Sequence, residues 1–299
     1  MSEFLGEIAG LATAGCWAFT SIFFTIGGTR VGSAVVNRIR LVLALIFLSV
    51  THFILTGQWF PLDAEPYRWG WLGLSGVIGL VIGDAMLFQA FVMIGTRLSM
   101  LLMSLVPIFS AVLAWVFLDE SLSAVEILAV TITIGGISWV IIDKNRSSSG
   151  ARGKHLIFGL VLGIGGAMGQ AGGLLTSRIG LEGDFPALSG NLIRMLTAAI
   201  VMWIITAFWG KAKETVLKLK DKKARYSILG GSFFGPFIGV WLSLVAIKYA
   251  KIGIASTLMS LTPVLLIPLV YWVFKEKITI HAVFGTITAV AGVAILFLA

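Results

Sequence analysis

The chain has 299 residues, of which 58% are apolar and only 12% charged, and its mean hydropathy is +1.00. A water-soluble core cannot bury that much apolar surface, so the composition excludes a soluble globular protein and makes the bilayer the solvent. The net charge of +8 does not indicate nucleic-acid binding, because the basic residues lie at the ends of apolar segments and in two loops, where they orient a membrane protein.

Ten apolar segments follow one another along the chain, each long enough to cross the ~30 Å hydrocarbon layer as a helix. They are 6–26, 34–55, 69–93, 97–118, 123–143, 156–177, 187–209, 227–250, 252–274 and 279–298. The segments are continuously apolar rather than alternating, which favours helices over strands of a barrel. The first starts with Glu3 and Glu7 instead of basic residues, so we expect a helix and not a cleaved signal peptide. The sequence thus predicts an all-α integral membrane protein with ten transmembrane helices.

Two sequence patterns recur half a chain apart. Met103-Ser-Leu-Val-Pro107 returns as Met259-Ser-Leu-Thr-Pro263, a shift of 156 residues. Asn37-x-x-Arg40, which opens the second segment, returns as Asn191-x-x-Arg194 at the start of the seventh. Each repeat contains five helices, an odd number, so the second repeat must enter the membrane from the opposite side. We therefore expect two inverted repeats around a central cavity, as in many secondary transporters.

The expected repeats are 1–146 and 156–299, joined by a flexible linker over 147–155. Of the 22 Lys and Arg, 17 lie on one expected face and 5 on the other. The positive-inside rule then places Lys144–Lys154 and Lys211–Arg225 in the cytoplasm and both termini outside. Within Lys211–Arg225 the pattern suits either a short interfacial helix on anionic headgroups or a solvated loop.

The two prolines of the repeated pentapeptide predict helix breaks. A proline inside a helix removes a hydrogen bond and crowds the carbonyl four residues before it, and Ser104 and Ser260 are placed to help satisfy the freed carbonyls. We expect Pro107 and Pro263 to kink helices that line and gate the cavity. The alternative is that both prolines only shape helix packing.

Glu120 and Glu276 each end an apolar run just before the next segment. We expect both to be structural, accepting backbone N–H groups in the first turn of the fifth and tenth helices. With the paired Met-Ser-Leu-x-Pro and the two five-helix units, they make the whole chain resemble the EamA-type branch of the drug/metabolite transporter superfamily.

That resemblance implies a ten-helix basket with a central cavity, with segments 123–143 and 279–298 at its periphery. It also implies movement of small metabolites, most often export. Substrates across that family include amino acids, sugars, nucleobases and quaternary amines, so the resemblance alone does not supply the ligand.

Asp84 is the acidic residue that lies well inside an expected helix, and its repeat counterpart is Val240. A buried carboxylate needs a partner or a wet cavity, so Asp84 is a candidate to bind a substrate ammonium or a transported proton. The alternative is a structural salt bridge to Arg40 or Arg194, or hydrogen bonds inside the bundle.

Other polar and aromatic side chains at mid-depth could contribute to a substrate site. Amides donate and accept hydrogen bonds, and aromatic rings wall a cavity or hold a cation, although both also serve ordinary helix packing. The candidates for the central cavity are Trp17, Asn37, Asp84, Phe88, Gln89, Gln170, Asn191 and Trp241.

We therefore expect a multi-pass transporter of the cytoplasmic (inner) membrane that exports a small polar or amphipathic metabolite, amino-acid-like by preference, through alternating access. The alternatives are a lipid-linked-sugar flippase component and a quaternary-amine or drug transporter of the same fold. The chain has no phosphate-binding Gly-x-x-x-x-Gly-Lys-Ser/Thr loop, so a proton gradient or the substrate's own gradient would supply the energy. We expect a monomer in contact with lipid, without a cofactor or nucleic-acid partner. We also expect no metal site and no enzymatic activity, since His52, His155 and His281 lie far apart in the sequence.

Overall fold

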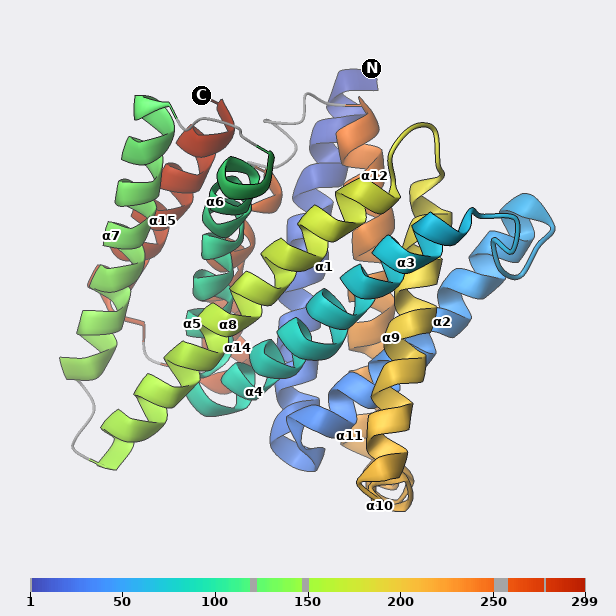
Figure 1. Cartoon of the computed structure of the whole chain (residues 1–299). Helices are drawn as coiled ribbons and strands as arrows, with labels where there is room; N and C mark the ends of the chain where they lie inside the picture. The colour runs from blue at the N-terminus through green and yellow to red at the C-terminus, as the bar shows by residue number, and fades with distance from the viewer. Residues whose placement is uncertain (1, 119–122, 147–150, 250–257, 277, 299) are drawn as a thin grey trace.

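A computed structural model of the chain describes residues 2–118, 123–146, 151–249, 258–276 and 278–298, and within these ranges the regular structure is entirely helical (Figure 1). The first half contains α1 (Ser2–Val31), α2 (Ser33–Thr56), α3 (Pro66–Ser75), η1 (Gly76–Gly83), α4 (Asp84–Ile94), α5 (Thr96–Leu102), η2 (Met103–Leu105), α6 (Val106–Leu118) and α7 (Ala124–Arg146). The second half contains α8 (Ala151–Gly180), α9 (Ala187–Phe208), α10 (Ala212–Lys218), α11 (Lys222–Ser232), η3 (Phe233–Gly239), α12 (Val240–Tyr249), α14 (Thr262–Phe274) and α15 (Ile280–Leu298).

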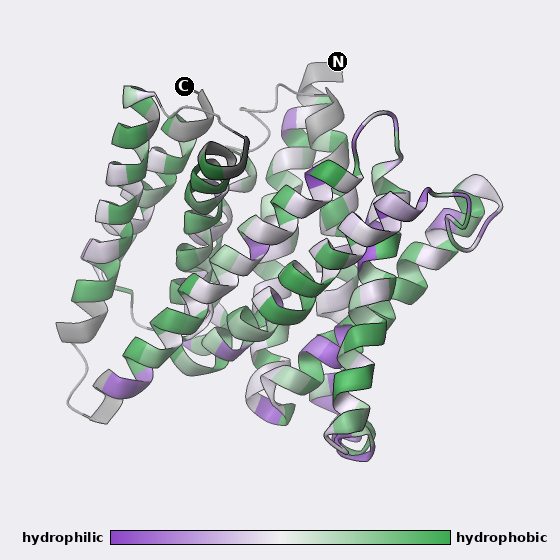
Figure 2. Ribbon diagram, viewed as in Figure 1, coloured by the Kyte–Doolittle hydropathy of each residue, from purple (hydrophilic) through white to green (hydrophobic). Residues whose placement is uncertain are grey.

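Five of the helical stretches are long and apolar enough to cross a bilayer: Leu5–Val31, Ser33–Thr56, Pro66–Ile94, Lys154–Gly180 and Ala187–Phe208. Large apolar side chains such as Ile54, Phe208 and Trp272 are exposed on the outside of the bundle. Figure 2 shows hydrophobic residues along the helices and hydrophilic residues gathered around α10 and near the start of α8. The chain is thus an all-helical multi-pass membrane protein, while the number of ten crossings stays a prediction.

Two segments of wide π-helix interrupt the bundle at equivalent places in the two halves. Gly76–Gly83 continues α3 into α4, and Phe233–Gly239 continues α11 into α12. In each, the N–H that follows bonds five residues back, from Asp84 to the Gly79 carbonyl and from Val240 to the Gly235 carbonyl. The 156-residue shift maps Asp84 onto Val240, so the repeat extends to this local backbone geometry.

The repeated pentapeptide also breaks the helix in both halves. Met103–Leu105 forms a 3₁₀ turn, and α6 restarts at Val106. The helix α14 starts at Thr262, so Pro263 lies in its first turn, where a proline costs no hydrogen bond. The Met103 carbonyl accepts the N–H of Val106 rather than the predicted Ser104 hydroxyl.

The second copy satisfies the corresponding carbonyl in another way. The Thr262 hydroxyl donates to the Met259 carbonyl at 2.9 Å. Val106 occupies the equivalent position in the first half and offers only its backbone N–H. Pro107 therefore follows a 3₁₀ turn within the helical run Thr96–Ser110, whereas Pro263 lies at the start of α14. The role of both prolines in kinking and gating stays a prediction.

The prediction that Glu276 caps the last helix is wrong. The Thr279 hydroxyl accepts the N–H of Ala282 at 3.1 Å, which makes Thr279 the N-cap of α15. Glu276 instead accepts a hydrogen bond from Arg97 at 3.2 Å, because it lies in the turn before the cap, opposite the start of α5. Glu120 lies outside the described residues.

The helices α7 and α15 pack along each other at one edge of the bundle and run in opposite directions (Figure 1). A methyl group added at Gly136 would lie 2.7 Å from the Gly285 carbonyl oxygen, and one added at Gly292 would lie 2.8 Å from the Ala129 carbonyl oxygen. The 156-residue shift maps each of these contacts onto the other. The crossing thus has local two-fold symmetry, and its small residues let the two backbones touch.

Elsewhere the two halves interleave. The first helix of each half packs against the third of the other: α1 contacts α11, η3 and α12, while α8 contacts α3, η1 and α4. Both termini lie at one end of the bundle and α10 lies at the other (Figure 1). Any site at the centre is therefore built from both halves.

Candidate functional site

Asp84 is the first residue after the π-helical segment, and only 6% of its surface is exposed. A π-helical turn displaces the backbone register by one residue and leaves carbonyl groups without their usual partners, which is why such turns occur often at functional sites. Here the Leu80 carbonyl accepts the side chains of Asn37 at 3.2 Å and Arg40 at 3.3 Å. The Gly79 carbonyl accepts Gln170 Nε2 at 3.2 Å.

Asp84 itself uses both carboxylate oxygens. Oδ2 forms an ion pair with Arg40 of α2, and Oδ1 accepts Gln170 Nε2 of α8 at 2.6 Å. Arg40 Nε donates to Asn37 Oδ1 at 2.9 Å. We call these four residues, Asn37, Arg40, Asp84 and Gln170, the central network. It joins three helices and both halves of the chain.

Phe88 covers one side of the central network. Its ring lies 4.9 Å from the Arg40 guanidinium carbon and stacks on Phe91 with centroids 5.7 Å apart. Phe24 of α1 contacts Phe88 at 5.0 Å between centroids. The Phe88 ring thus makes a cation–π contact with Arg40 that adds to the ion pair with Asp84.

A second arginine lies beside the central network. Arg194 of α9 is the repeat counterpart of Arg40, and the Asp84 charge acts on it, although within the described residues the two form no ion pair. A methyl group at Gly79 would lie 3.7 Å from Arg194 Nη2 and 3.8 Å from Gln170 Oε1. The Arg194 guanidinium and the Gln170 amide therefore share one side of the π-helical segment.

Among the predicted site residues, the structure brings together Asn37, Asp84, Phe88 and Gln170. The other predicted site residues lie outside the central network. Gln89 Oε1 accepts the Ser33 hydroxyl at 2.5 Å. Trp17 packs on Gly239, where an added methyl group would lie 3.1 Å from the indole nitrogen.

Trp241 is exposed and contacts Phe237 at 6.3 Å between ring centroids. Asn191 is buried next to Arg194 on α9. Ser104, Pro107, Ser260 and Pro263 flank the two helix restarts.

The sequence predicts Arg40 and Arg194 only as possible structural partners of Asp84, whereas the structure places both arginines at the candidate site. A signal for them was present: the spacing Asn-x-x-Arg occurs in both halves and places the two side chains on one helix face.

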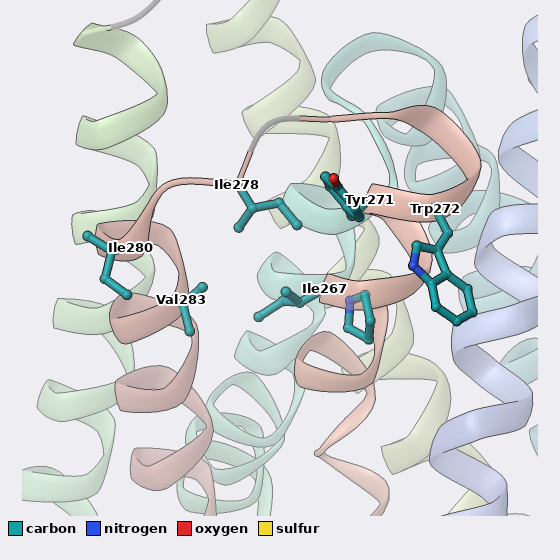
Figure 3. Close-up of a pocket in the computed structure, with 7 residues that line it drawn as sticks. Ile267, Tyr271, Trp272, Ile278, Ile280 and Val283 are labelled. Atoms are coloured by element: carbon teal, nitrogen blue, oxygen red, sulfur yellow. The ribbon is translucent and has the colours of Figure 1, made fainter.

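An apolar groove of about 450 Å³ lies between α14 and α15 (Figure 3), and none of the residues that line it belongs to the central network. Ile267, Pro268, Tyr271, Trp272, Ile278, Ile280 and Val283 line it. The lining offers one hydroxyl and one indole N–H, which is little for a polar metabolite and suits a hydrocarbon chain. Among the described residues, no group of three or more His, Cys, Asp or Glu side chains is placed to hold a metal ion.

Comparison with known proteins agrees with this architecture. The EamA-like transporter family matches the chain twice, over residues 4–142 and 157–298. A protein solved by crystallography, which carries no more specific description, superposes with a TM-score of 0.67 at 13% sequence identity, covering 98% of this chain and 96% of its own. That likeness concerns the fold alone, and no curated protein matches the chain in sequence. Since the family matches both halves over nearly their whole length, the chain belongs to the EamA-like transporter family.

Proposed function

We propose that the chain is a secondary active transporter that moves a small polar or amphipathic metabolite, amino-acid-like by preference, out across the cytoplasmic membrane. It works as a monomer by alternating access between two inverted repeats, 1–146 and 156–299, joined over 147–155. Ten transmembrane helices belong to this proposal, which places both termini outside.

One observation carries the proposal. The hydrogen bond between Gln170 and Asp84, 2.6 Å long, ties the second half of the chain to an ion pair of the first half. A buried ion pair is held only while each charge keeps its partner, so a ligand or proton that competes for Asp84 loosens the tie between the halves. That coupling is what exchange between two conformations needs.

The energy comes from a proton gradient or from the gradient of the substrate. Protonation of Asp84 removes the negative charge that holds Arg40, which links proton uptake to the conformational step. In this scheme Pro107 and Pro263 let the restarted helices pivot at the cavity.

The test is counterflow into proteoliposomes that contain the purified protein, using labelled amino acids, nucleobases, sugars and quaternary amines in turn. We expect one chemical class to accumulate, to respond to an imposed pH gradient, and to lose that response in Asp84→Asn. Asp63→Asn, an exposed acid in the loop between α2 and α3, is the matched control and keeps the response.

Unchanged, pH-dependent counterflow in Asp84→Asn would refute the role of the central network. The groove between α14 and α15 is the observation that favours the flippase alternative, because an acyl or prenyl chain fits its apolar lining. Movement of a fluorescent lipid-linked sugar between leaflets, without counterflow of any soluble compound, would replace the proposed function with that alternative.

A further inference from the structure

The two Asn-x-x-Arg pairs of the repeat differ in one respect. In the first half, Arg40 Nε donates to Asn37 Oδ1, and Asn37 Nδ2 donates to the Leu80 carbonyl. In the second half, Arg194 Nε and Asn191 Nδ2 are both buried, and neither has a hydrogen-bond partner in the described part of the chain. The repeat thus supplies its own comparison. The polar groups of the first pair are hydrogen-bonded, whereas in the second pair, which we call the open pair, Arg194 Nε and Asn191 Nδ2 are not.

The charges around the open pair are also unbalanced. Asp84 is committed to Arg40 and Gln170 through its two oxygens, so Arg194 is left with long-range attraction only. The second half has Val240 at the position of Asp84, and therefore has no carboxylate at that place. Two guanidinium groups thus share one carboxylate.

Arg194 has little freedom to withdraw from this place. A methyl group at Gly76 would overlap the Arg194 carbonyl oxygen, so the backbone of α9 lies directly on the π-helical segment. One turn further, Gly73 lies against Thr197, at 3.3 Å from an added methyl group. A cation held by packing in a membrane interior, beside a carboxylate that already pairs with another cation, is unfavourable, and an anion brought from outside relieves that cost.

We propose that Arg194 and Asn191 form an anion site that binds a carboxylate of the transported compound. This inference rests on the proposed function and names the substrate class within it. The guanidinium offers a planar fork that matches a carboxylate with two parallel hydrogen bonds, and the Asn191 amide adds a third donor one turn earlier. Gln170 Oε1, on the same side of Gly79 as Arg194 Nη2, is placed to accept from a donor group on the same ligand.

The experiment compares benzoate with benzamide, which has the same shape without the charge. The melting temperature of the protein in neutral detergent is followed by tryptophan fluorescence at fixed sodium chloride concentration. We expect benzoate to raise the melting temperature by about 3–6 °C at roughly tenfold excess over its Kd, and benzamide to have no such effect. Arg194→Gln abolishes the benzoate shift, while Arg225→Gln, which removes an exposed arginine of α11, keeps it.

A second readout separates a binding role from a structural one. Without carboxylate, Arg194→Gln removes an unpaired cation, so we expect its melting temperature to equal or exceed that of the unaltered protein. A marked fall, or a benzoate shift that survives in Arg194→Gln, would overturn the inference. Counterflow of a cationic or neutral compound by Arg194→Gln, at the rate of the unaltered protein, would overturn the anion site alone and would leave the proposed transport function intact. Absence of counterflow of any compound by the unaltered protein would count against the proposed function itself.

Discussion

Removing the charge of Asp84 should destabilise the protein more than removing the charge of Arg40. Asp84→Asn leaves two buried guanidinium groups, Arg40 and Arg194, without a carboxylate, and breaking a buried ion pair on one side costs about 3–5 kcal/mol. Arg40→Gln leaves Asp84 with Gln170 and the nearby Arg194 charge, so we expect a smaller loss, on the order of 1–3 kcal/mol.

The assay is thermal unfolding in detergent, completed as a double-mutant cycle. At about 2–4 °C per kcal/mol, Asp84→Asn lowers the melting temperature by about 6–20 °C. The double variant Asp84→Asn/Arg40→Gln should melt above Asp84→Asn alone, because it leaves one unpaired cation instead of two. Additive losses, or a larger loss for Arg40→Gln than for Asp84→Asn, would refute this assignment of the charges.

Three further predictions concern packing, a helix cap and pH. Gly136→Ala places a methyl group 2.5 Å from the Ala289 nitrogen and should lower the free energy of unfolding by about 1–3 kcal/mol. The control Gly135→Ala, whose added methyl group has nothing within 4 Å, should leave the free energy of unfolding unchanged. Equal effects of the two substitutions would contradict the contact between α7 and α15. Thr279→Ala should lower stability by about 1 kcal/mol through loss of the α15 cap, and no loss in the melting temperature would argue against that cap. Hydrogen bonds from Arg30 and from the N–H of Ala224 hold the pKa of Asp221 below its ordinary value of 3.8, so the carboxylate stabilises the folded state above that pH. The difference in melting temperature between the protein and Asp221→Ala should be constant near neutral pH and shrink as the pH falls through 3.8 and lower. A difference that grows instead would contradict this linkage.

In the basic segment before α11, the pKa of another carboxyl group, that of Glu214, is also lowered. Lys218 and Lys211 lower the pKa of Glu214 to about 2, first through hydrogen bonds to its carboxylate. The carboxylate of Glu214 therefore stays charged below its ordinary pKa of 4.5, and its ion pairs with Lys211 and Lys218 persist there.

The all-helical fold and the repeat could be predicted from the sequence, because hydropathy and spacing report directly on both. The π-helical segments could not be predicted, since a one-residue change of register leaves hydropathy untouched. A methyl group at Gly169 would lie 2.6 Å from the Gly83 Cα atom, so small residues let α8 approach this segment, but close packing does not specify the type of turn.

The central network was predictable only in part. Asp84 stood out because a carboxylate inside an apolar segment needs an explanation, and Arg40 was one of two partners considered. The choice between Arg40 and Arg194 depends on which helix face the π-helical turn presents, and this information is three-dimensional. The Glu276 prediction failed because a better capping residue, Thr279, lies three positions later, closer to the start of the helix.

The π-helical segment also sets the direction in which Asp84 points. Each residue of an α-helix turns the next by about 100°, and a π-helical turn takes up one extra residue, so the same residues wound as a regular α-helix would place Asp84 at roughly that angle from its present direction relative to α3. The carboxylate would then leave Arg40 and Gln170 and face a neighbouring helix or lipid. A change of local winding, with no change in composition or hydropathy, is therefore enough to separate a chain that assembles the central network from one that only shares its fold.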